Sequence, residues 1–433
     1  NNTYSGSTAI NSGAITITGS LADTADVTVA SGASYNVNSA DTINRILGSG
    51  TANLGANLTL SSNLDFEFGG AFAGSGSLRK TGSGILTLSG DSSFTGNLLL
   101  NNSRLIIASP NALGASTVET SSGILEVANG IVLGSLRVSG PVRIASDIIT
   151  TGLQTYNGAV TIAPNAGNLA QMTNYARVAY SAAGVTLTST GNGAITFNST
   201  IDAASAKNAS LRIDAGTGTV TLGGSVGSSV PLQNLYVIGG TINLLADVLT
   251  AQEQTYKGAT RIGNNGSEGF LYPQFVASTR PITGFVPASR LFTRTLMSKD
   301  PTVRFEGSVN PDSAGAYTLA IAAIYNGFVN GISANEPRII INGLVGNTGA
   351  FHSVNFQTLQ AANLFMLVGE ISTMGVNTVD MQTYSSNALT VTLNPANNIA
   401  TFRSTRPNYI NFDLTMVGGE FNMSSDPGVV QVI

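Results

Sequence analysis

Few residues of this chain have side chains that could carry out acid–base or nucleophilic chemistry. His352 is the only histidine and cysteine is absent. A Cys–His pair is therefore excluded, and a Ser-His-acid triad would have to use His352. The segment Phe351–Phe356 alternates apolar and polar residues like a strand, so we interpret His352 as an outward or turn residue rather than a general base. Metal sites built from histidine and cysteine are excluded by composition.

A pair of carboxylates is the remaining enzymatic option. Asp65 and Glu67 alternate with apolar residues in the run Leu64–Phe68, which predicts that both acids lie on one face of a strand and the apolar residues on the other. Clustered acids of this kind cleave glycosidic bonds in many enzymes. Arg79 and Lys80 would lie across the next coil and could neutralise them. No second acidic pair recurs at the repeat spacing. We therefore expect a solvated strand face, no enzymatic activity and no cofactor.

Charge and composition exclude other classes of function. The net charge of −4 and the sparse aromatic residues argue against nucleic-acid binding. The glycine-rich strings near residues 74–76 and 82–84 stand between strands, so they do not predict a phosphate-binding loop before a helix. No run of eighteen apolar residues occurs, which predicts that the chain has no membrane-spanning helix.

Residues 266–300 differ in composition from the rest of the chain. They contain three prolines, and proline cannot donate to a strand ladder, so we expect this segment to leave the regular structure as a loop. Aromatic and arginine side chains are typical of contact surfaces. The alternative is that the aromatic residues cover an apolar flank of the protein. The candidate partner-contact residues are Phe270, Tyr272, Phe275, Arg280, Phe285, Arg290, Phe292 and Arg294.

The elements that would position these residues are strands. Charged residues make up 10% of the chain and hydrophobic residues 42%, with 50 glycines, so there is enough apolar side chain for a core but little that favours helices. The stretch Gly74–Ser109 alternates short apolar runs with pairs of turn-forming residues. A unit of this kind cannot bury its apolar face alone, which predicts stacked copies.

One type of internal repeat covers approximately residues 1–130. Residues 2–17 align without a gap on residues 92–107. The run Leu78–Gly90, followed by Phe94–Gly96 and Asn111–Gly114, resembles the passenger-associated repeat of bacterial autotransporters. That pattern is a Leu-x-Lys-x-Gly-x-Gly-x-Leu-x-Leu-x-Gly core, an aromatic-Thr-Gly corner and an Asn-Ala-Leu-Gly turn. The chain departs from it at Ser103, where the family usually has glycine.

A second type of repeat covers residues 131–433. Gln154-Thr155-Tyr156 recurs as Gln254-Thr255-Tyr256 at an offset of 100 and again as Gln382-Thr383-Tyr384. The order of a Thr-Phe strand, a Val-Gly corner and this motif is similar to the β-helical shafts of filamentous-haemagglutinin-like exoproteins. We therefore divide the chain at residue 130 into two β-helical segments, the second interrupted by residues 266–300.

The predicted fold is all-β: a right-handed parallel β-helix, or solenoid, with a loop excursion near 266–300. Each coil of about 20–25 residues would carry two or three strands, with apolar side chains inward and Thr, Ser and Asn outward. A row of β-sandwiches is the alternative, but it would require linkers that the sequence lacks.

The two resemblances imply a non-enzymatic structural or adhesive shaft on the surface of a Gram-negative bacterium, exported and associated with the outer membrane or secreted. Implied partners are other copies of the chain or cell-surface proteins and glycans. The alternative is a self-assembling envelope or filament subunit, because the residues at 1–4 and 429–433 do not resemble caps and β-helices with open ends can stack. A polysaccharide lyase or hydrolase is the third and least favoured interpretation.

Overall fold

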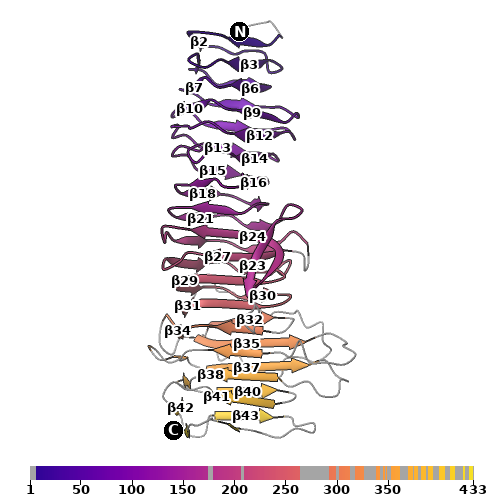
Figure 1. Ribbon diagram of the computed structural model, residues 1–433, viewed down its shortest axis with the longest axis vertical. Coiled ribbons are helices and arrows are strands. Elements are labelled where there is room, and N and C mark those ends of the chain that lie inside the picture. The colour runs from indigo at the N-terminus through magenta and orange to yellow at the C-terminus, as the bar shows by residue number, and fades with distance from the viewer. Residues whose placement is uncertain are drawn as a thin grey trace. The chain divides into compact units, whose positions relative to one another are not determined.

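The computed structural model describes residues 6–173, 179–205 and 209–263, and beyond them the strands and a few adjoining residues. The later described stretches are 292–298, 302–312, 317–325, 338–341, 345–346, 348, 353–360, 369–373, 375–378, 382–386, 389–393, 399–404, 410–414, 423–424 and 429–432. All regular elements in these stretches are strands (Figure 1). The chain forms two compact units, unit 1 from Asn1–Ala170 and Ala183–Ser199, and unit 2 from Gln171–Ala182 and Thr200–Ile433.

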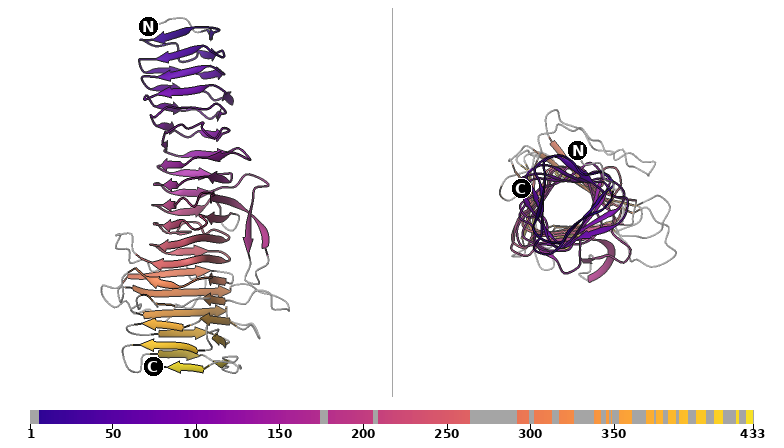
Figure 2. Two further views of the ribbon diagram at one scale, coloured as in Figure 1. Left: turned by 60° about the vertical axis from the view of Figure 1, so that its left-hand side comes forward. Right: turned by 90° about the horizontal axis from the view of Figure 1, so that it is seen from above.

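Unit 1 is a stack of coils whose strands pair in parallel with those of the next coil (Figure 1). Seen along the stack, the coils of unit 1 superpose around a common centre (Figure 2). One sheet contains β1 (Thr8–Ile10), β3 (Asp26–Val29) and β6 (Arg45–Gly48), and a second contains β2 (Ala14–Ile17), β4 (Ser34–Val37), β7 (Thr51–Leu54) and β10 (Ala71–Gly74). The third contains β5 (Asp41–Ile43), β8 (Leu58–Leu60), β11 (Leu78–Lys80), β13 (Leu98–Leu100), β15 (Val118–Thr120), β17 (Val132–Leu133), β18 (Leu136–Ser139), β20 (Ile148–Thr150), β21 (Gln154–Tyr156), the end of β24 (Ala179–Ser189) and β25 (Ile195–Phe197). The fourth contains β9 (Phe66–Phe68), β12 (Ile85–Leu88), β14 (Arg104–Ile107), β16 (Gly123–Val127), β19 (Val142–Ile144) and β22 (Val160–Ile162).

The coil repeat of unit 1 follows from the pairing register. Leu58 pairs with Leu78, Leu78 with Leu98 and Leu98 with Val118, a step of 20 residues each time. All four side chains are fully buried, whereas Arg79 between them in phase is exposed. Each buried leucine contributes roughly 1.5–3 kcal/mol, so the column of inward side chains provides much of the stability of this face. The predicted parallel β-helix is confirmed.

Aromatic side chains fill the corner where the early coils lose a strand. Phe68, Phe72 and Phe94 are fully buried, with ring centroids 4.8 Å apart for the first pair and 5.9 Å for the second. Phe94 stands in the third coil without a strand of its own, yet Ser93 N still donates to Phe72 O at 2.8 Å. The ladder therefore continues through a turn, and the coils carry three strands before this point and fewer after it.

Unit 2 has longer strands that turn from one face of the coil to the next. Two of them, β29 and β31, are ten and nine residues long and pair with a register shift between Ile238 and Thr241. The shift falls at Gly239 and Gly240. A bulge at glycine bends a strand, so one strand can serve two faces. Unit 2 contains most of β23 (Leu169–Thr173), the start of β24, β26 (Ile201–Ala203), β27 (Ser210–Asp214), β28 (Thr219–Leu222), β29 (Leu235–Leu244), β30 (Val248–Thr250), β31 (Gln254–Ile262), β32 (Phe292–Ser298), β33 (Thr302–Phe305), β34 (Val309–Pro311), β35 (Tyr317–Tyr325), β36 (Arg338–Ile341), β37 (Ser353–Gln360), β38 (Gly369–Thr373), β39 (Gly375–Thr378), β40 (Gln382–Ser386), β41 (Leu389–Leu393), β42 (Ile399–Ser404), β43 (Ile410–Leu414), β44 (Met423–Ser424) and β45 (Val429–Val432).

Part of the predicted excursion at 266–300 is regular structure. Residues 292–298 form β32, which pairs in parallel with β30 and β35. Residues 264–291 lie outside the described residues. The predicted change of repeat type at residue 130 stays a prediction, and the division into compact units falls elsewhere, between residues 170 and 200.

Candidate functional site

The predicted partner-contact residues lie mostly outside the described part of the chain. This holds for Phe270, Tyr272, Phe275, Arg280, Phe285 and Arg290. The structure places the other two, Phe292 and Arg294, in β32, where the backbone pairs them with Tyr317 and Leu319. Their assignment as contact residues stays a prediction. His352 also lies outside the described residues.

The structure places both candidate carboxylates on the outside of the coil, as the alternation predicted. Asp65 and Glu67 are exposed, and each has a different partner: Asp65 Oδ1 accepts a hydrogen bond from Ile85 N at 2.8 Å, and Glu67 accepts one from the Ser89 hydroxyl. Both partners belong to the next coil. Each acid is therefore used singly to join two coils, and the two do not share a proton or a common partner.

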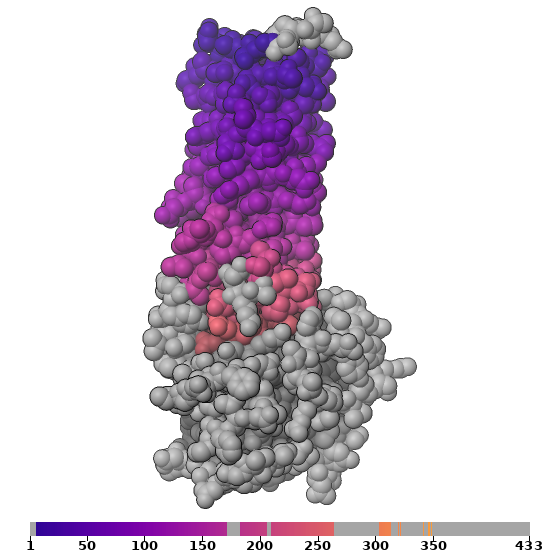
Figure 3. Space-filling view, turned by 90° about the vertical axis from the view of Figure 1, so that its right-hand side faces the viewer, coloured from indigo at the N-terminus to yellow at the C-terminus, as the bar shows by residue number. Residues whose placement is uncertain are grey.

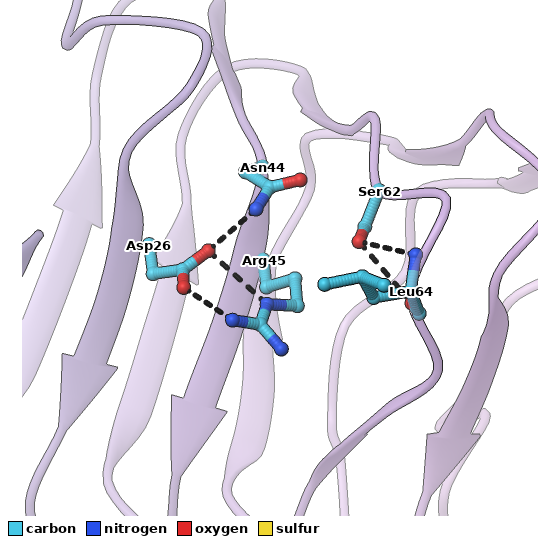
Figure 4. Close-up of polar contacts among 5 residues, drawn as sticks. All are labelled: Asp26, Asn44, Arg45, Ser62 and Leu64. Atoms are coloured by element: carbon cyan, nitrogen blue, oxygen red, sulfur yellow. Dashed lines mark hydrogen bonds and ion pairs between the residues drawn. The ribbon is translucent and has the colours of Figure 1, made fainter. Parts of the chain in front are cut away.

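Two details of the prediction for this region were wrong. The side chain of Leu64 is 60% exposed instead of facing inward with the two phenylalanines, because Ser62 holds a tight turn in which its Oγ accepts from Leu64 N at 3.0 Å (Figure 4). Lys80 does not lie on the surface beside Asp65 and Glu67, because it is fully buried. Its strand, β11, runs inward-outward-inward at Leu78, Arg79 and Lys80.

The ammonium group of Lys80 is enclosed by backbone carbonyl groups at a coil corner. Its Nζ donates to the carbonyl oxygens of Ser62 at 2.9 Å, Thr81 at 2.5 Å and Gly82 at 3.2 Å. It also lies 5.9 Å from the centre of the Phe66 ring. Burial disfavours the charged form and lowers the pKa of Lys80 to about 8, while the negative charge of Asp65 acts in the opposite direction.

A lysine with a lowered pKa can serve as a base or a nucleophile, but this geometry opposes both roles. An ammonium group has three N–H donors, and the three carbonyl groups engage all of them. The side chain has no exposed surface through which a substrate could reach it. Lys80 therefore acts as a buried cation that joins the turn at Ser62 to the turn at Gly82, one coil further on. The inward phase shared with Leu78 was the signal in the sequence that could have identified it.

Ser103, the position that departs from the autotransporter pattern, lies on the next coil. It is buried, and its hydroxyl donates to the carbonyl oxygen of Lys80 at 3.1 Å. Glycine could not make this bond. The departure therefore adds a side-chain link between the Lys80 strand and the following coil.

Ion pairs in unit 1 join neighbouring coils. Asp26 accepts from the guanidinium group of Arg45, with Nη2–Oδ2 at 2.5 Å and Nε–Oδ1 at 3.2 Å, and from Asn44 Nδ2 at 2.8 Å (Figure 4). The hydrogen bonds from Arg45 are the main reason why the pKa of Asp26 is lowered. Arg104 and Glu126 form a second pair between consecutive coils, and Asn165 Nδ2 donates to the other oxygen of Glu126 at 2.9 Å. These carboxylates are neutralised locally and have no role that requires a free acid.

Amide side chains form a hydrogen-bonded column on the outer face of β2, β4 and β7. Asn53 Nδ2 donates to Asn36 Oδ1 at 2.7 Å, and Asn36 Nδ2 donates to Thr16 Oγ1 at 3.1 Å. The three residues lie on successive coils at matching register positions. Polar residues on this outer face therefore satisfy one another along the stack.

The rest of the described surface shows no arrangement of metal ligands. No group of three or more His, Cys, Asp or Glu residues that could hold an ion occurs in the stretches that the structure covers. Within those stretches there is also no helix long and apolar enough to cross a membrane. The face of unit 1 seen in Figure 3 is an even surface of stacked coils without a deep hollow.

Comparisons with models of protein families, with curated proteins and with solved structures found no match. The parallel β-helix with side chains that bond from coil to coil is thus the description that the structure itself supports.

Proposed function

We propose that the chain is a non-enzymatic, extracellular structural or adhesive shaft of a Gram-negative surface or secreted protein. The observation that carries the proposal is the use of polar side chains in unit 1. Asp26, Glu67 and Glu126 each bond to a residue of a neighbouring coil, and so does Asn36. Side chains that bond along the stack stabilise a scaffold, whereas catalytic groups must converge on one point and leave room for a substrate.

Contact with partners would then fall to segments that interrupt the coils. Residues 264–291 contain most of the aromatic and arginine residues predicted as contacts. Cell-surface proteins and glycans are the proposed partners. The alternative is assembly of copies end to end, which predicts that the purified protein forms filaments that lengthen with concentration. Sedimentation that gives one species at all concentrations would eliminate this alternative.

A loop variant tests the adhesive role. We expect that the first variant below lowers binding of the labelled protein to cultured epithelial cells or to bacterial cells at least tenfold, because aromatic and arginine side chains dominate the energy of most interfaces. The variant leaves Phe292 and Arg294 unchanged because they belong to β32. It replaces Phe270, Tyr272, Phe275, Arg280, Phe285 and Arg290 by serine.

The matched control changes the same loop without touching the proposed contacts. It replaces Ser267, Ser278, Thr279, Thr283 and Ser289 by alanine. This control should bind as the unaltered protein does, and circular dichroism should show equal strand content in all three proteins. Equal cell binding by all three would remove the loop as an adhesive site.

The absence of enzymatic activity is tested separately. We expect no release of reducing ends or unsaturated products from polygalacturonate, alginate or peptidoglycan. Any such activity that disappears in both Asp65→Asn and Glu67→Gln, but persists in Glu119→Gln, would show that the exposed acids are catalytic after all.

A further inference from the structure

The Gln-Thr-Tyr repeats form the same buried hydrogen-bonded group twice. We call Thr150, Gln154 and Tyr156 the first Gln-Tyr module. Tyr156 Oη donates to Gln154 Oε1 at 2.9 Å, and Thr150 Oγ1 donates to the carbonyl oxygen of Gly152 at 2.8 Å. All three module side chains are fully buried. Burial raises the pKa of Tyr156, so its hydroxyl stays a donor over the range in which the protein is handled.

The second Gln-Tyr module, Thr250, Gln254 and Tyr256, repeats this geometry in unit 2. Tyr256 Oη donates to Gln254 Oε1 at 3.0 Å, and Thr250 Oγ1 donates to the carbonyl oxygen of Gln252 at 2.7 Å. These side chains are also fully buried. The two modules thus share residue types, spacing and bonding, although they lie 100 residues apart.

Each module stands on the last strand before an unusually long coil. Leu136 pairs with Gln154 after 18 residues, but Gln154 pairs with Ile195 only after 41. In unit 2, Leu235 pairs with Gln254 after 19 residues and Gln254 with Val303 after 49. Coils further along unit 2 also lengthen, to 36 residues between Val303 and Ile339. The two longest steps in the described ladders are those that follow a module.

The contacts of the modules point toward the strand that returns after the insertion. The ring of Tyr156 stacks on Phe197 at 4.8 Å and 12°, and Tyr256 stacks on Phe305 at 4.9 Å and 16°. In unit 1, Gln154 Nε2 also donates to the carbonyl oxygen of Thr188 at 2.9 Å. Thr188 belongs to the returning strand β24, and Phe197 to β25.

A long insertion creates a specific difficulty for a β-helix. A short turn sets the register of the next strand, but a long segment does not, and a slip of one residue would move every inward side chain to the outside. A buried glutamine whose Nε2 must reach one carbonyl group, and a ring that must stack on one phenylalanine, accept only one register. A half-satisfied buried network is costly, so other registers are penalised.

We propose that the Gln-Tyr module is a register anchor, which allows a coil to carry a long insertion and return to the ladder correctly. Segments 164–183 and 264–291 are then exchangeable with respect to folding, and their sequences are free to serve binding. This role does not depend on the proposed adhesive function, because it concerns only how the coil closes.

Hydrogen exchange in the first module tests the proposal. We expect Tyr156→Phe, and more strongly Gln154→Leu, to raise the exchange rates of amides 187–197 at least tenfold while those of 136–144, before the insertion, change less than twofold. Tyr156→Phe keeps the ring and deletes one hydroxyl, so it remains informative if Gln154→Leu fails to fold.

A shortened chain provides the control. With residues 166–181 replaced by a four-residue Gly/Ser turn, the coil approaches the length of its neighbours, and Tyr156→Phe should then raise exchange at 187–197 less than threefold. Replacement of 166–181 by a Gly/Ser segment of equal length should leave exchange at 187–197 unchanged. Equal effects of Tyr156→Phe on both sides of the insertion, or the same effect in the shortened chain, would overturn the proposal.

Discussion

Replacing Gly96 by alanine is expected to lower the free energy of unfolding by about 2–3 kcal/mol, the upper part of the range for overpacked sites. A Cβ atom at Gly96 would lie 2.1 Å from the carbonyl oxygen of Gly76, one coil away. A Cβ at Gly76 would meet Ala56 O at the same distance. Adjacent coils are held at the strand spacing of about 4.8 Å by their ladders, so the backbone cannot move aside without breaking hydrogen bonds.

Gly134 offers the matched control for this substitution. A Cβ at Gly134 would meet nothing within 4 Å, and its backbone does not have a positive φ angle. Gly134→Ala should therefore change the free energy of unfolding by less than about 0.5 kcal/mol. Urea unfolding followed by far-ultraviolet circular dichroism measures both variants. Equal stability of the two would mean that the coil corner at Gly96 is wider than described.

Lys80→Met is the second substitution with a large expected effect. Methionine fills a similar volume but donates no hydrogen bond, so the carbonyl groups of Ser62, Thr81 and Gly82 lose a buried donor. Leaving buried polar groups unpaired costs about 1–3 kcal/mol each, partly offset because a buried charge is also removed. We expect a net loss of about 2–4 kcal/mol at pH 7. Arg79→Met, on the same strand but exposed, should be nearly neutral.

The same residue predicts a pH dependence with a definite sign. The pKa of Lys80 is about 8 in the folded protein, compared with its ordinary value of 10.5. Between these values the unfolded chain binds more protons than the folded one, so the contribution of Lys80 to stability increases as the pH rises through this window. The stability difference between the unaltered protein and Lys80→Met should therefore widen from pH 7 to pH 9.5. A constant difference would show that the amine titrates normally and is accessible to water.

The sequence predicted the fold class and the phase of many strands correctly. Alternation of side chains has a period of two along any strand, so it determines which residues face inward before any partner strand is known. Leu78 and Leu98, predicted as core residues, are buried, and Asp65 and Glu67, predicted as surface residues, are exposed. Recognition of the coil needed only these local patterns and the turn residues between them.

The position of each repeat within the coil was not predictable in this way. Residues 8–10 and 98–100 occupy equivalent positions in the 90-residue repeat, yet β1 belongs to the sheet of β3 and β6, and β13 to the sheet of β8 and β11. Ninety residues is not a whole number of coils of 20. The repeated motif thus specifies a strand-turn-strand unit, while the lengths of all intervening turns decide which face that unit occupies.

The sequence by itself therefore determined that the chain is all-β, that its strands alternate inward and outward residues, and that it has almost no residues for acid–base or nucleophilic chemistry. Only the tertiary structure decided that Lys80 is enclosed by carbonyl groups, that Asp26 is paired with Arg45, and that Tyr156 stacks on Phe197. The reason is physical. These contacts join residues about 20 to 40 positions apart, and they exist only once the turn lengths have stacked one coil on the next.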